Sequence, residues 1–100
     1  MLVFFSGRRI KGGHWDQFRE AWASDEDLAG LPDGAVIYHA RSVKDPDEVI
    51  SFGIFPVEKD SIDEVRGDEE EGAQRELEIA KHVEDTPMEG IYEVVEEIRP

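Results

Sequence analysis

The chain has 100 residues, with 25 Asp or Glu against 11 Lys or Arg and a formal net charge of −14. A chain this short is expected to form a single domain over residues 1–100, because it buries only about two-thirds of the surface that it exposes when unfolded. Its negative charge excludes nucleic acids and anionic membranes as partners, since their phosphate groups would be repelled.

Cysteine is absent from the sequence. Disulfides, thiolate nucleophiles and cysteine-based zinc sites are therefore excluded. No apolar run approaches the roughly 20 residues of a membrane-spanning helix, and the absence of a charged-then-apolar leader predicts a cytoplasmic protein. Hydrophobic residues make up 39% of the chain, which is enough to predict a folded domain rather than a disordered one.

The sequence opens with a predicted strand and a predicted helix. Residues 2–10 begin with a β-branched and aromatic run, which is typical of a strand buried on both faces. Trp15, Phe18 and Trp22 then recur at the spacing of one helix face. We expect an amphipathic helix over residues 14–24.

A turn and a pair of strands are predicted next. Residues 25–31 could hold a further short turn of helix before a Pro-Asp-Gly turn signal. Strands are expected at residues 35–43 and 49–57. The link between these two segments is too short for a parallel crossover, so they are predicted to form an antiparallel hairpin.

Two helices and one strand are predicted in the second half. Ser61 and Glu64 have the spacing of a capping box, which predicts a short helix that ends at Gly67. A longer helix is expected to run from Asp68 to the Thr-Pro pair at 86 and 87. Its expected apolar face consists of Ala73, Leu77, Ala80 and Val83. The last strand is expected at residues 91–98.

This order of elements, β-α-β-β-α-β, is typical of the α+β ferredoxin-like split βαβ fold, with helices on one face of a four-stranded antiparallel sheet. The strands, however, carry large apolar side chains on both faces, as the adjacent Phe4 and Phe5 illustrate. The helices cover one face only, and a bare second face would exceed the apolar patch that soluble monomers tolerate. We therefore expect a homodimer with the two sheets packed face to face.

Four segments carry a resemblance to a known family. They are Arg8–Gly12, Phe18–Trp22, Arg41–Glu48 and Gly90–Val95. Through these loose patterns nearly the whole chain resembles the antibiotic-biosynthesis-monooxygenase-type (ABM-like) domains of the dimeric α+β barrel superfamily. The resemblance implies a dimeric α+β barrel with a small-molecule pocket between sheet and helices in each subunit. It also makes a cofactor-independent monooxygenase one candidate activity.

The haem-degrading branch of this superfamily does not match the sequence. Its pattern places an asparagine on the first strand, where this chain has Ser6 and Gly7. It also places a tryptophan and a haem-ligating histidine in the helix after the third strand. Residues 61–83 contain no tryptophan, and His82 lies at their far end. Haem is therefore not expected, and no other cofactor is implied.

His39 is the candidate catalytic residue. A histidine in the middle of a predicted strand could face the pocket, and an imidazole with a pKa near 6.5 could remove a proton from a phenolic or enolic substrate. The resulting electron-rich anion could react with O₂ without a metal or flavin. The alternative, which we favour, is a structural histidine bonded to a neighbouring strand or to Arg41.

Aromatic residues are the candidate pocket walls. Trp15 and Trp22 could form a wall for a planar ligand, although such a stripe is more often core. Tyr38 and Tyr92 could point hydroxyl groups into the pocket or belong to the dimer interface.

Arginines are unusual in so acidic a chain. Arg8, Arg9 or Arg41 could pair with a substrate carboxylate, although pairing with the surplus of Asp and Glu is the commoner use. Arg41 is included among the pocket residues.

No histidine has partners at ligand spacing, so no metal is expected. The function predicted is a small-molecule-binding homodimer that acts as a cofactor-free monooxygenase on an aromatic or enolisable compound. The alternative is a non-catalytic dimer that binds a metabolite or a protein. The acidity fits adaptation to high salt or docking to a basic partner.

Overall fold

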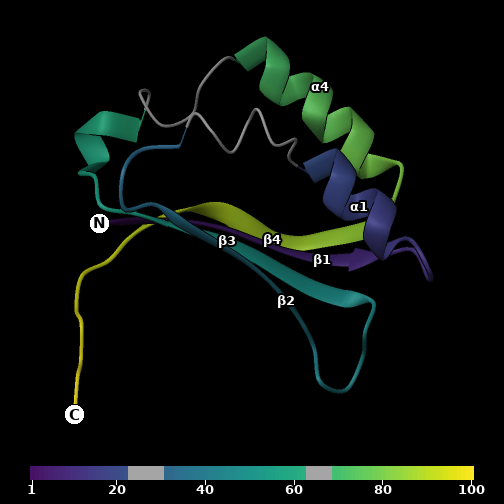
Figure 1. The fold of residues 1–100 in the computed structure, drawn as a ribbon, viewed down its shortest axis with the longest axis horizontal. Helices are drawn as coiled ribbons and strands as arrows, with labels where there is room; N and C mark the ends of the chain where they lie inside the picture. The colour runs from purple at the N-terminus through teal and green to yellow at the C-terminus, as the bar shows by residue number, and fades with distance from the viewer. Residues whose placement is uncertain (23–30, 63–68) are drawn as a thin grey trace.

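A computed structural model describes residues 1–22, 31–62 and 69–100 of the chain (Figure 1). Its elements, in chain order, are β1 (Leu2–Ile10), α1 (Trp15–Trp22), β2 (Val36–Arg41), β3 (Glu48–Phe55), the 3-10 turn η1 (Lys59–Ser61), α4 (Glu69–Ala80) and β4 (Val83–Glu93). None of the described helices is long and apolar enough to cross a bilayer.

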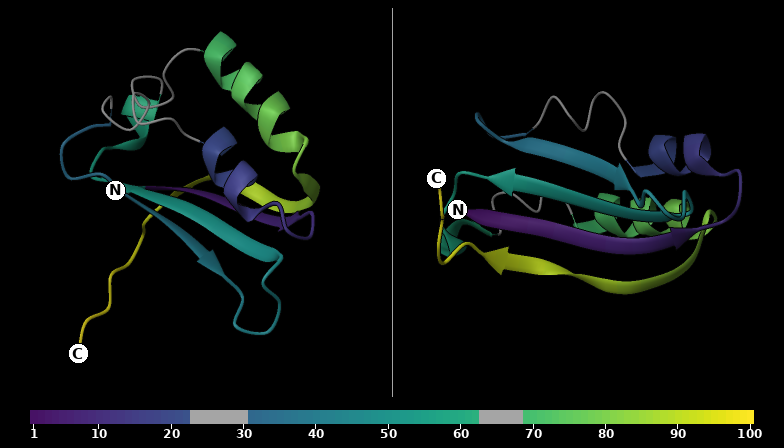
Figure 2. Two further views of the ribbon diagram at one scale, coloured as in Figure 1. Left: turned by 45° about the vertical axis from the view of Figure 1, so that its right-hand side comes forward. Right: turned by 90° about the horizontal axis from the view of Figure 1, so that it is seen from below.

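The four strands form one antiparallel sheet in the order β2-β3-β1-β4. The strands that are adjacent in sequence, β2 and β3, pair as the predicted hairpin, while β1 lies between β3 and β4. Helices α1 and α4 lie side by side on one face of the sheet, and the other face carries none of the described helices (Figures 1 and 2). The predicted α+β ferredoxin-like arrangement with a four-stranded antiparallel sheet is therefore confirmed.

The helices and the sheet enclose a small hydrophobic core. Phe18 of α1 is completely buried, and it packs with Ile10, Val49 and Ile79. The side chains of Trp15 and Trp22 pack against this cluster but stay partly exposed. The helix face predicted from Trp15, Phe18 and Trp22 is therefore the face that α1 buries.

The prediction for the last strand is wrong in position. The strand was expected at residues 91–98, whereas β4 spans Val83–Glu93 and residues 94–100 have no regular structure. β4 is an edge strand that pairs with β1 alone. An edge strand tolerates the polar residues and the proline at position 87 that argued against a strand, because one side of its backbone needs no partner.

The expected apolar face of the second long helix is also wrong. Ala73, Leu77 and Ala80 are exposed, and the side chain of Leu77 keeps 69% of its surface. Ile79 is instead the residue of α4 that enters the core. Val83 belongs to β4 rather than to the helix.

Parts of two further predictions lie outside the described residues. The helical turn expected at residues 25–31 is described only at Leu31, and the capping partner Glu64 is not described. Ser61 ends the 3-10 turn η1.

The sheet has a large apolar surface on the face without helices, which we call the helix-free face. The side chains assigned to it by the strand register are Val3, Phe5, Val36, Tyr38, Ile50, Phe52, Ile54, Met88 and Tyr92. Tyr38 and Met88 each keep about half of their surface exposed, at 50% and 51%. The prediction of apolar side chains on both faces of the sheet is thus confirmed.

Candidate functional site

A cavity of about 770 Å³ lies between the sheet and the helices. Most of its lining comes from the helix-facing side of the strands, from α4 and from the end of α1. The lining residues include Phe4, Ser6, Arg8, Trp22, Leu31, Ile37, Ser51, Gly53, Phe55, Gly72, Arg75, Glu76, Ile79, Glu89 and Ile91. A mostly apolar space with a few polar groups is the usual character of a small-molecule site.

Four polar residues form a row across the helix-facing side of the sheet, one from each strand. Ser6 of β1 lies opposite Glu89 of β4 and opposite Ser51 of β3, and Ser51 lies opposite His39 of β2. Cross-strand partners share one face of a sheet, so these side chains are neighbours. We call this set the polar row.

An apolar row lies next to the polar row. Phe4 is opposite both Ile91 and Gly53, and Gly53 is opposite Ile37. A Cβ atom on Gly53 would lie 2.7 Å from Cε2 of Phe55. The glycine therefore leaves room for the Phe55 ring, which lines the cavity.

His39 is held by one hydrogen bond and three aromatic rings. Its Nδ1 lies 2.8 Å from the hydroxyl oxygen of Ser51. The rings of Trp15, Phe18 and Trp22 meet the imidazole edge to face, with centroid distances of 6.0, 6.0 and 4.7 Å. Burial lowers the pKa of His39 below 6.5, and the charges of nearby arginines lower it further. The imidazole is therefore neutral at pH 7.

Both alternatives for His39 find support in this geometry. His39 bonds to a neighbouring strand, as a structural histidine would, and it faces the helices, as a catalytic one should. Its imidazole is not among the residues that line the cavity, whereas its partner Ser51 is. A ligand in the cavity would therefore contact Ser51, and His39 only through its hydrogen bond to Ser51.

Ser51 is a site residue that the sequence interpretation missed. The buried residues of β3 alternate as Val49, Ser51, Gly53 and Phe55. A serine at an inward-facing position of an otherwise apolar strand was the available signal. It could be read only once the face that β3 turns to the helices was known.

Arg8 is the second polar group that the structure buries. Its side chain is 4% exposed, and its Nη2 lies 3.9 Å from a carboxylate oxygen of Glu76. Its guanidinium lies over the ring of Phe18, 5.7 Å from the centroid. Nη1 is buried and has no hydrogen-bond partner among the described residues. Such an unsatisfied donor costs about 1–3 kcal/mol of stability.

The charge on Arg8 survives this burial. Burial lowers the pKa of Arg8, and the carboxylates of Glu76 and Glu89 oppose that shift. A guanidinium remains protonated at any physiological pH. The cavity therefore contains a fixed positive charge at its sheet side.

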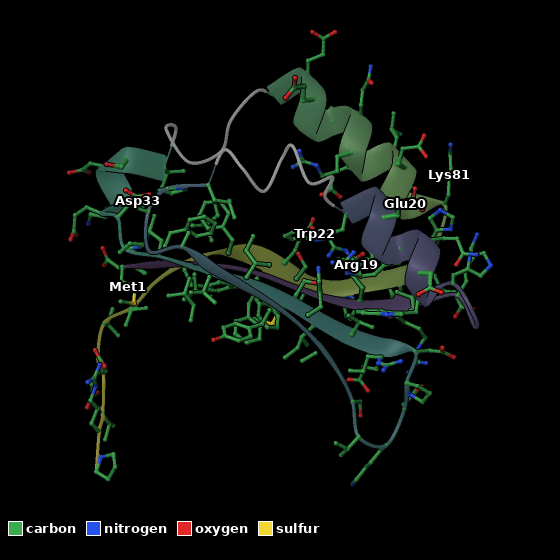
Figure 3. The ribbon with its side chains drawn as sticks, viewed as in Figure 1. Met1, Arg19, Glu20, Trp22, Asp33 and Lys81 are labelled. Carbon is green, nitrogen blue, oxygen red and sulfur yellow. The ribbon has the colours of Figure 1, made fainter. Side chains whose placement is uncertain are left out.

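The other predicted arginines have different surroundings. Arg9 is exposed, and its Nη2 lies 2.8 Å from Asp45. Arg41 lies over the ring of Trp15, 5.2 Å from the centroid. Of the two predicted tryptophan walls, Trp22 lines the cavity, while Trp15 and Arg41 are not among its lining residues. Figure 3 shows Trp22 at the end of α1, above the sheet.

The predicted pocket position of Tyr38 and Tyr92 is wrong for this cavity, because both lie on the helix-free face. Tyr38 is stacked on Phe52 with a centroid distance of 5.2 Å. Tyr92 is opposite Val3 and meets the ring of Phe5 edge to face at 6.5 Å. Their alternative role, in a dimer interface, stays a prediction.

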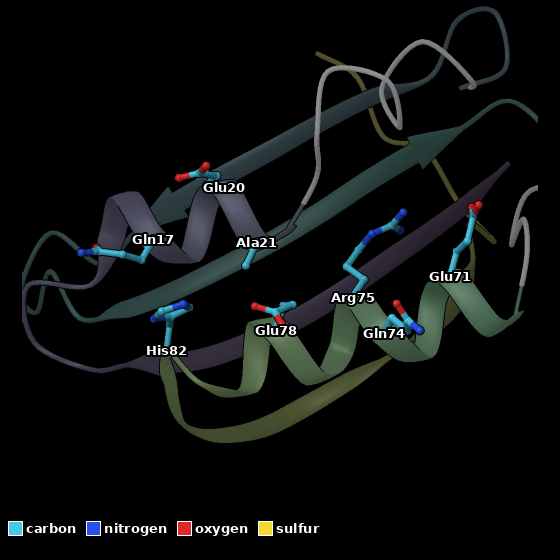
Figure 4. Close-up of a pocket in the computed structure, with 8 residues that line it drawn as sticks. All are labelled: Gln17, Glu20, Ala21, Glu71, Gln74, Arg75, Glu78 and His82. Carbon is cyan, nitrogen blue, oxygen red and sulfur yellow. The ribbon is translucent and has the colours of Figure 1, made fainter.

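A second hollow of about 590 Å³ lies between the two helices (Figure 4). Its lining is largely polar and includes Glu20, Glu78 and His82. Nδ1 of His82 lies 3.0 Å from Nδ1 of His14, so the two imidazoles join the end of α4 to the start of α1. Within residues 1–22, 31–62 and 69–100, no three His, Asp or Glu side chains converge as a metal site would require.

Comparisons with known proteins find the fold but no close relative. No family model and no curated protein matches the sequence. A protein from Chloroflexus aurantiacus J-10-fl, described as a candidate antibiotic biosynthesis monooxygenase, superposes with a TM-score of 0.65 at 13% identity, covering 98% of this chain and 96% of its own. The chain shares the fold of that protein.

A second solved structure agrees. The candidate antibiotic biosynthesis monooxygenase from Nitrosomonas europaea superposes with a TM-score of 0.64 at 16% identity, covering 96% of this chain and 100% of its own. The ABM-like resemblance is therefore confirmed at the level of the fold. At these identities the shared fold says nothing about which residues act.

Proposed function

We propose that the protein binds a small aromatic or enolisable compound in the cavity and oxidises it with O₂, without a metal or flavin. The observation that carries the proposal is the hydrogen bond between the cavity residue Ser51 and the neutral imidazole of His39. The ABM-like fold, shared with two candidate monooxygenases, supports it.

The polar row supplies a path for one proton. With Nδ1 of His39 unprotonated, the Ser51 hydroxyl donates its hydrogen bond to that nitrogen. A substrate hydroxyl placed against Ser51 would donate to the serine oxygen. As the substrate proton moves to Ser51, the serine proton moves to His39, and the substrate becomes a phenolate or enolate. A neutral imidazole is the form that this step needs.

The oxidation itself then requires only the anion and O₂. The electron-rich anion gives electrons to O₂ and forms a carbon–oxygen bond. At a ring CH₂ group the new carbon–oxygen bond gives a peroxide anion, which takes back the proton held by His39 and becomes a hydroperoxide. Loss of the remaining C–H proton with cleavage of the O–O bond then leaves a carbonyl, so one oxygen atom enters the product and the other leaves as water. Phe4, Phe55 and Ile91 give the cavity apolar walls, and an anion held against such walls would be less solvated than in bulk water.

Oxygen consumption with a panel of phenols and enolisable ketones tests the proposal. Once a substrate is found, Ser51→Ala and His39→Gln should each lower kcat at least about 100-fold, the usual contribution of a positioned base. Ser42→Ala is the matched control, because this serine lies in the turn after β2 and accepts bonds from backbone N–H groups there. Full activity in both cavity variants would remove the proposed base.

A second candidate function is supported by the enclosure of His39. Three aromatic rings surround the imidazole, and it does not line the cavity. In a protein that only binds a metabolite, this histidine would have a structural role alone. Ligand binding in the cavity without oxygen consumption for any compound of the panel would favour this alternative.

A further inference from the structure

We infer that the cavity selects ligands that carry one negative charge, an aromatic carboxylate above all, and that Arg8 is the residue that binds the carboxylate. The inference rests on the proposed function in that it names the substrate class for the same cavity. It also holds for a binding protein that performs no chemistry.

The guanidinium of Arg8 is incompletely hydrogen-bonded. Arg8 is 4% exposed, yet its ion-pair partner Glu76 is 3.9 Å away and itself 63% exposed. Nη1 has no hydrogen-bond partner in the described part of the chain. A guanidinium presents two parallel N–H donors that match the two oxygens of a carboxylate. A ligand carboxylate would supply the acceptor that the described residues do not.

The strand register indicates where the ring of a ligand would lie if its carboxylate bound Arg8. Arg8 is opposite Val49, so Ser51 occupies the diagonal position on the neighbouring strand, two residues along β3. The backbone atoms of diagonal positions on paired strands are about 7–8 Å apart, which is the scale of a one-ring or two-ring aromatic. Its ring would extend from Arg8 toward the polar row and the apolar side chains of Phe4 and Phe55.

Other charged side chains surround the cavity beside Arg8. Glu76 and Glu89 line it and act on Arg8, and Arg75 adds a second positive charge. The two carboxylates would repel a dianion such as a phosphate monoester more strongly than a carboxylate. A smaller hollow of about 280 Å³, to which Arg8 also contributes, is lined by Glu76, Glu84 and Asp85, which disfavour an anion there. We therefore expect a monoanion in the larger cavity, with its carboxylate on Arg8.

Binding of 2-naphthoate and of its uncharged isostere 2-naphthamide tests the inference, with dissociation constants measured by calorimetric titration at pH 7.5. The wild type should bind the carboxylate at least about tenfold more tightly than the amide, because a hydrogen-bonded ion pair replaces a neutral contact. Arg8→Gln should abolish this preference. Arg9→Gln should retain it, because Arg9 is an exposed neighbour that pairs with Asp45.

Several outcomes would overturn the inference. They are equal affinity of the wild type for acid and amide, a dissociation constant for naphthoate above about 1 mM, and an unchanged preference in Arg8→Gln. Circular dichroism would show whether Arg8→Gln folds. If it does not, Arg8→Lys takes its place, since a point charge should retain part of the preference while losing the bidentate contact.

The two proposals fail separately in these measurements. Neither naphthoate nor naphthamide carries an oxidisable hydroxyl, so this binding does not depend on oxygen chemistry. A preference for naphthoate without oxygen consumption by the panel would retain the charge selection and remove the monooxygenase. Oxygen consumption by uncharged phenols with no preference for naphthoate would do the reverse.

Discussion

His39 shows how one residue couples the chemistry of the site to the stability of the fold. It is kept neutral by burial and by the charges of Arg19 and Arg8, which lower its pKa below the ordinary value of 6.5. Its neighbours Trp15 and Trp22 contribute apolar contact, and Ser51 contributes a hydrogen bond. Protonation of an imidazole in such surroundings costs stability.

The stability of the protein should therefore depend on the titration of His39. In the unfolded chain this residue takes up a proton near pH 6.5, whereas in the folded chain it does so only at lower pH. The stabilisation is fully present above pH 6.5 and is lost as the pH falls through the folded-state pKa. The free energy of unfolding of the wild type relative to His39→Gln should fall over that window, by at most about 1.4 kcal/mol per pH unit.

Urea unfolding of both proteins between pH 8 and pH 5 measures this difference. The comparison with His39→Gln is essential, because lowering the pH also relieves the repulsion within a chain of charge −14. All other ionisable groups of the chain are shared by the two proteins. A difference that stays constant or grows as the pH falls would contradict the prediction.

The site could be predicted from the sequence only in part. The sequence does not determine which of two alternating sets of side chains a strand turns toward the helices. His39 and Trp22 could be chosen because their residue types and spacings are informative. Whether Tyr38 or its neighbour His39 faces the helices depends on a shift of one residue, which the sequence does not determine. The burial of Arg8 and the inward position of Ser51 depend on the same register, so neither could be assigned before the structure.

Among the secondary-structure elements, those whose own sequence pattern matches their place in the fold are predicted well. β1, α1 and the β2–β3 hairpin carry strong signals of their own and lie where they were expected. β4 does not, because its sequence is polar and contains a proline, and its strand conformation depends on pairing with the whole length of β1. α4 differs again, since its spacing of Ala73, Leu77 and Ala80 indicated a face that the structure exposes.

The orientation of α4 gives a prediction for two variants of one helix. Ile79→Ala should lower the free energy of unfolding by about 2–5 kcal/mol, because Ile79 is 3% exposed and packs in the core. Leu77→Ala removes a similar side chain that is 69% exposed. Its effect should stay within about 0.5 kcal/mol. If α4 buried the face predicted from its sequence periodicity, Leu77→Ala would lower the free energy of unfolding more than Ile79→Ala.

Urea unfolding at one fixed protein concentration, followed by the fluorescence of Trp15 and Trp22, measures both values. Equal m-values for the variants and the wild type would show that the unfolding transition itself is unchanged. A loss for Leu77→Ala as large as that for Ile79→Ala would contradict the orientation of α4 described above.

At the scale of the whole molecule, the helix-free face is the feature without a covering layer. Tyr38, Tyr92 and Met88 expose 50%, 40% and 51% of their surfaces on it. Residues 94–100 extend to the same side of the sheet (Figures 1 and 2). Among them Val95 and Ile98 are 87% and 83% exposed. An apolar surface of this kind marks an interaction site in a soluble protein.

We propose that a second copy of the chain covers the helix-free face, and that the protein is a homodimer at micromolar concentration. A symmetric pair would bury Tyr38 and Phe52 of both copies and give the apolar tail residues a surface to contact. Each copy carries a charge of −14. The dimer should therefore tighten as added salt screens the repulsion, which is the opposite of the behaviour expected for docking to a basic partner.

Sedimentation velocity of the wild type and of two lysine variants tests the homodimer. Tyr38→Lys places a charge within the proposed interface, where burying it without a partner costs several kcal/mol, so this variant should sediment as a monomer. Leu77→Lys changes the net charge equally on the exposed side of α4 and should remain a dimer. Because a lysine reduces the net negative charge, dissociation by Tyr38→Lys could not come from greater repulsion between the copies. A wild-type monomer at micromolar concentration, or a dimer that persists in Tyr38→Lys, would contradict a homodimer built on the helix-free face.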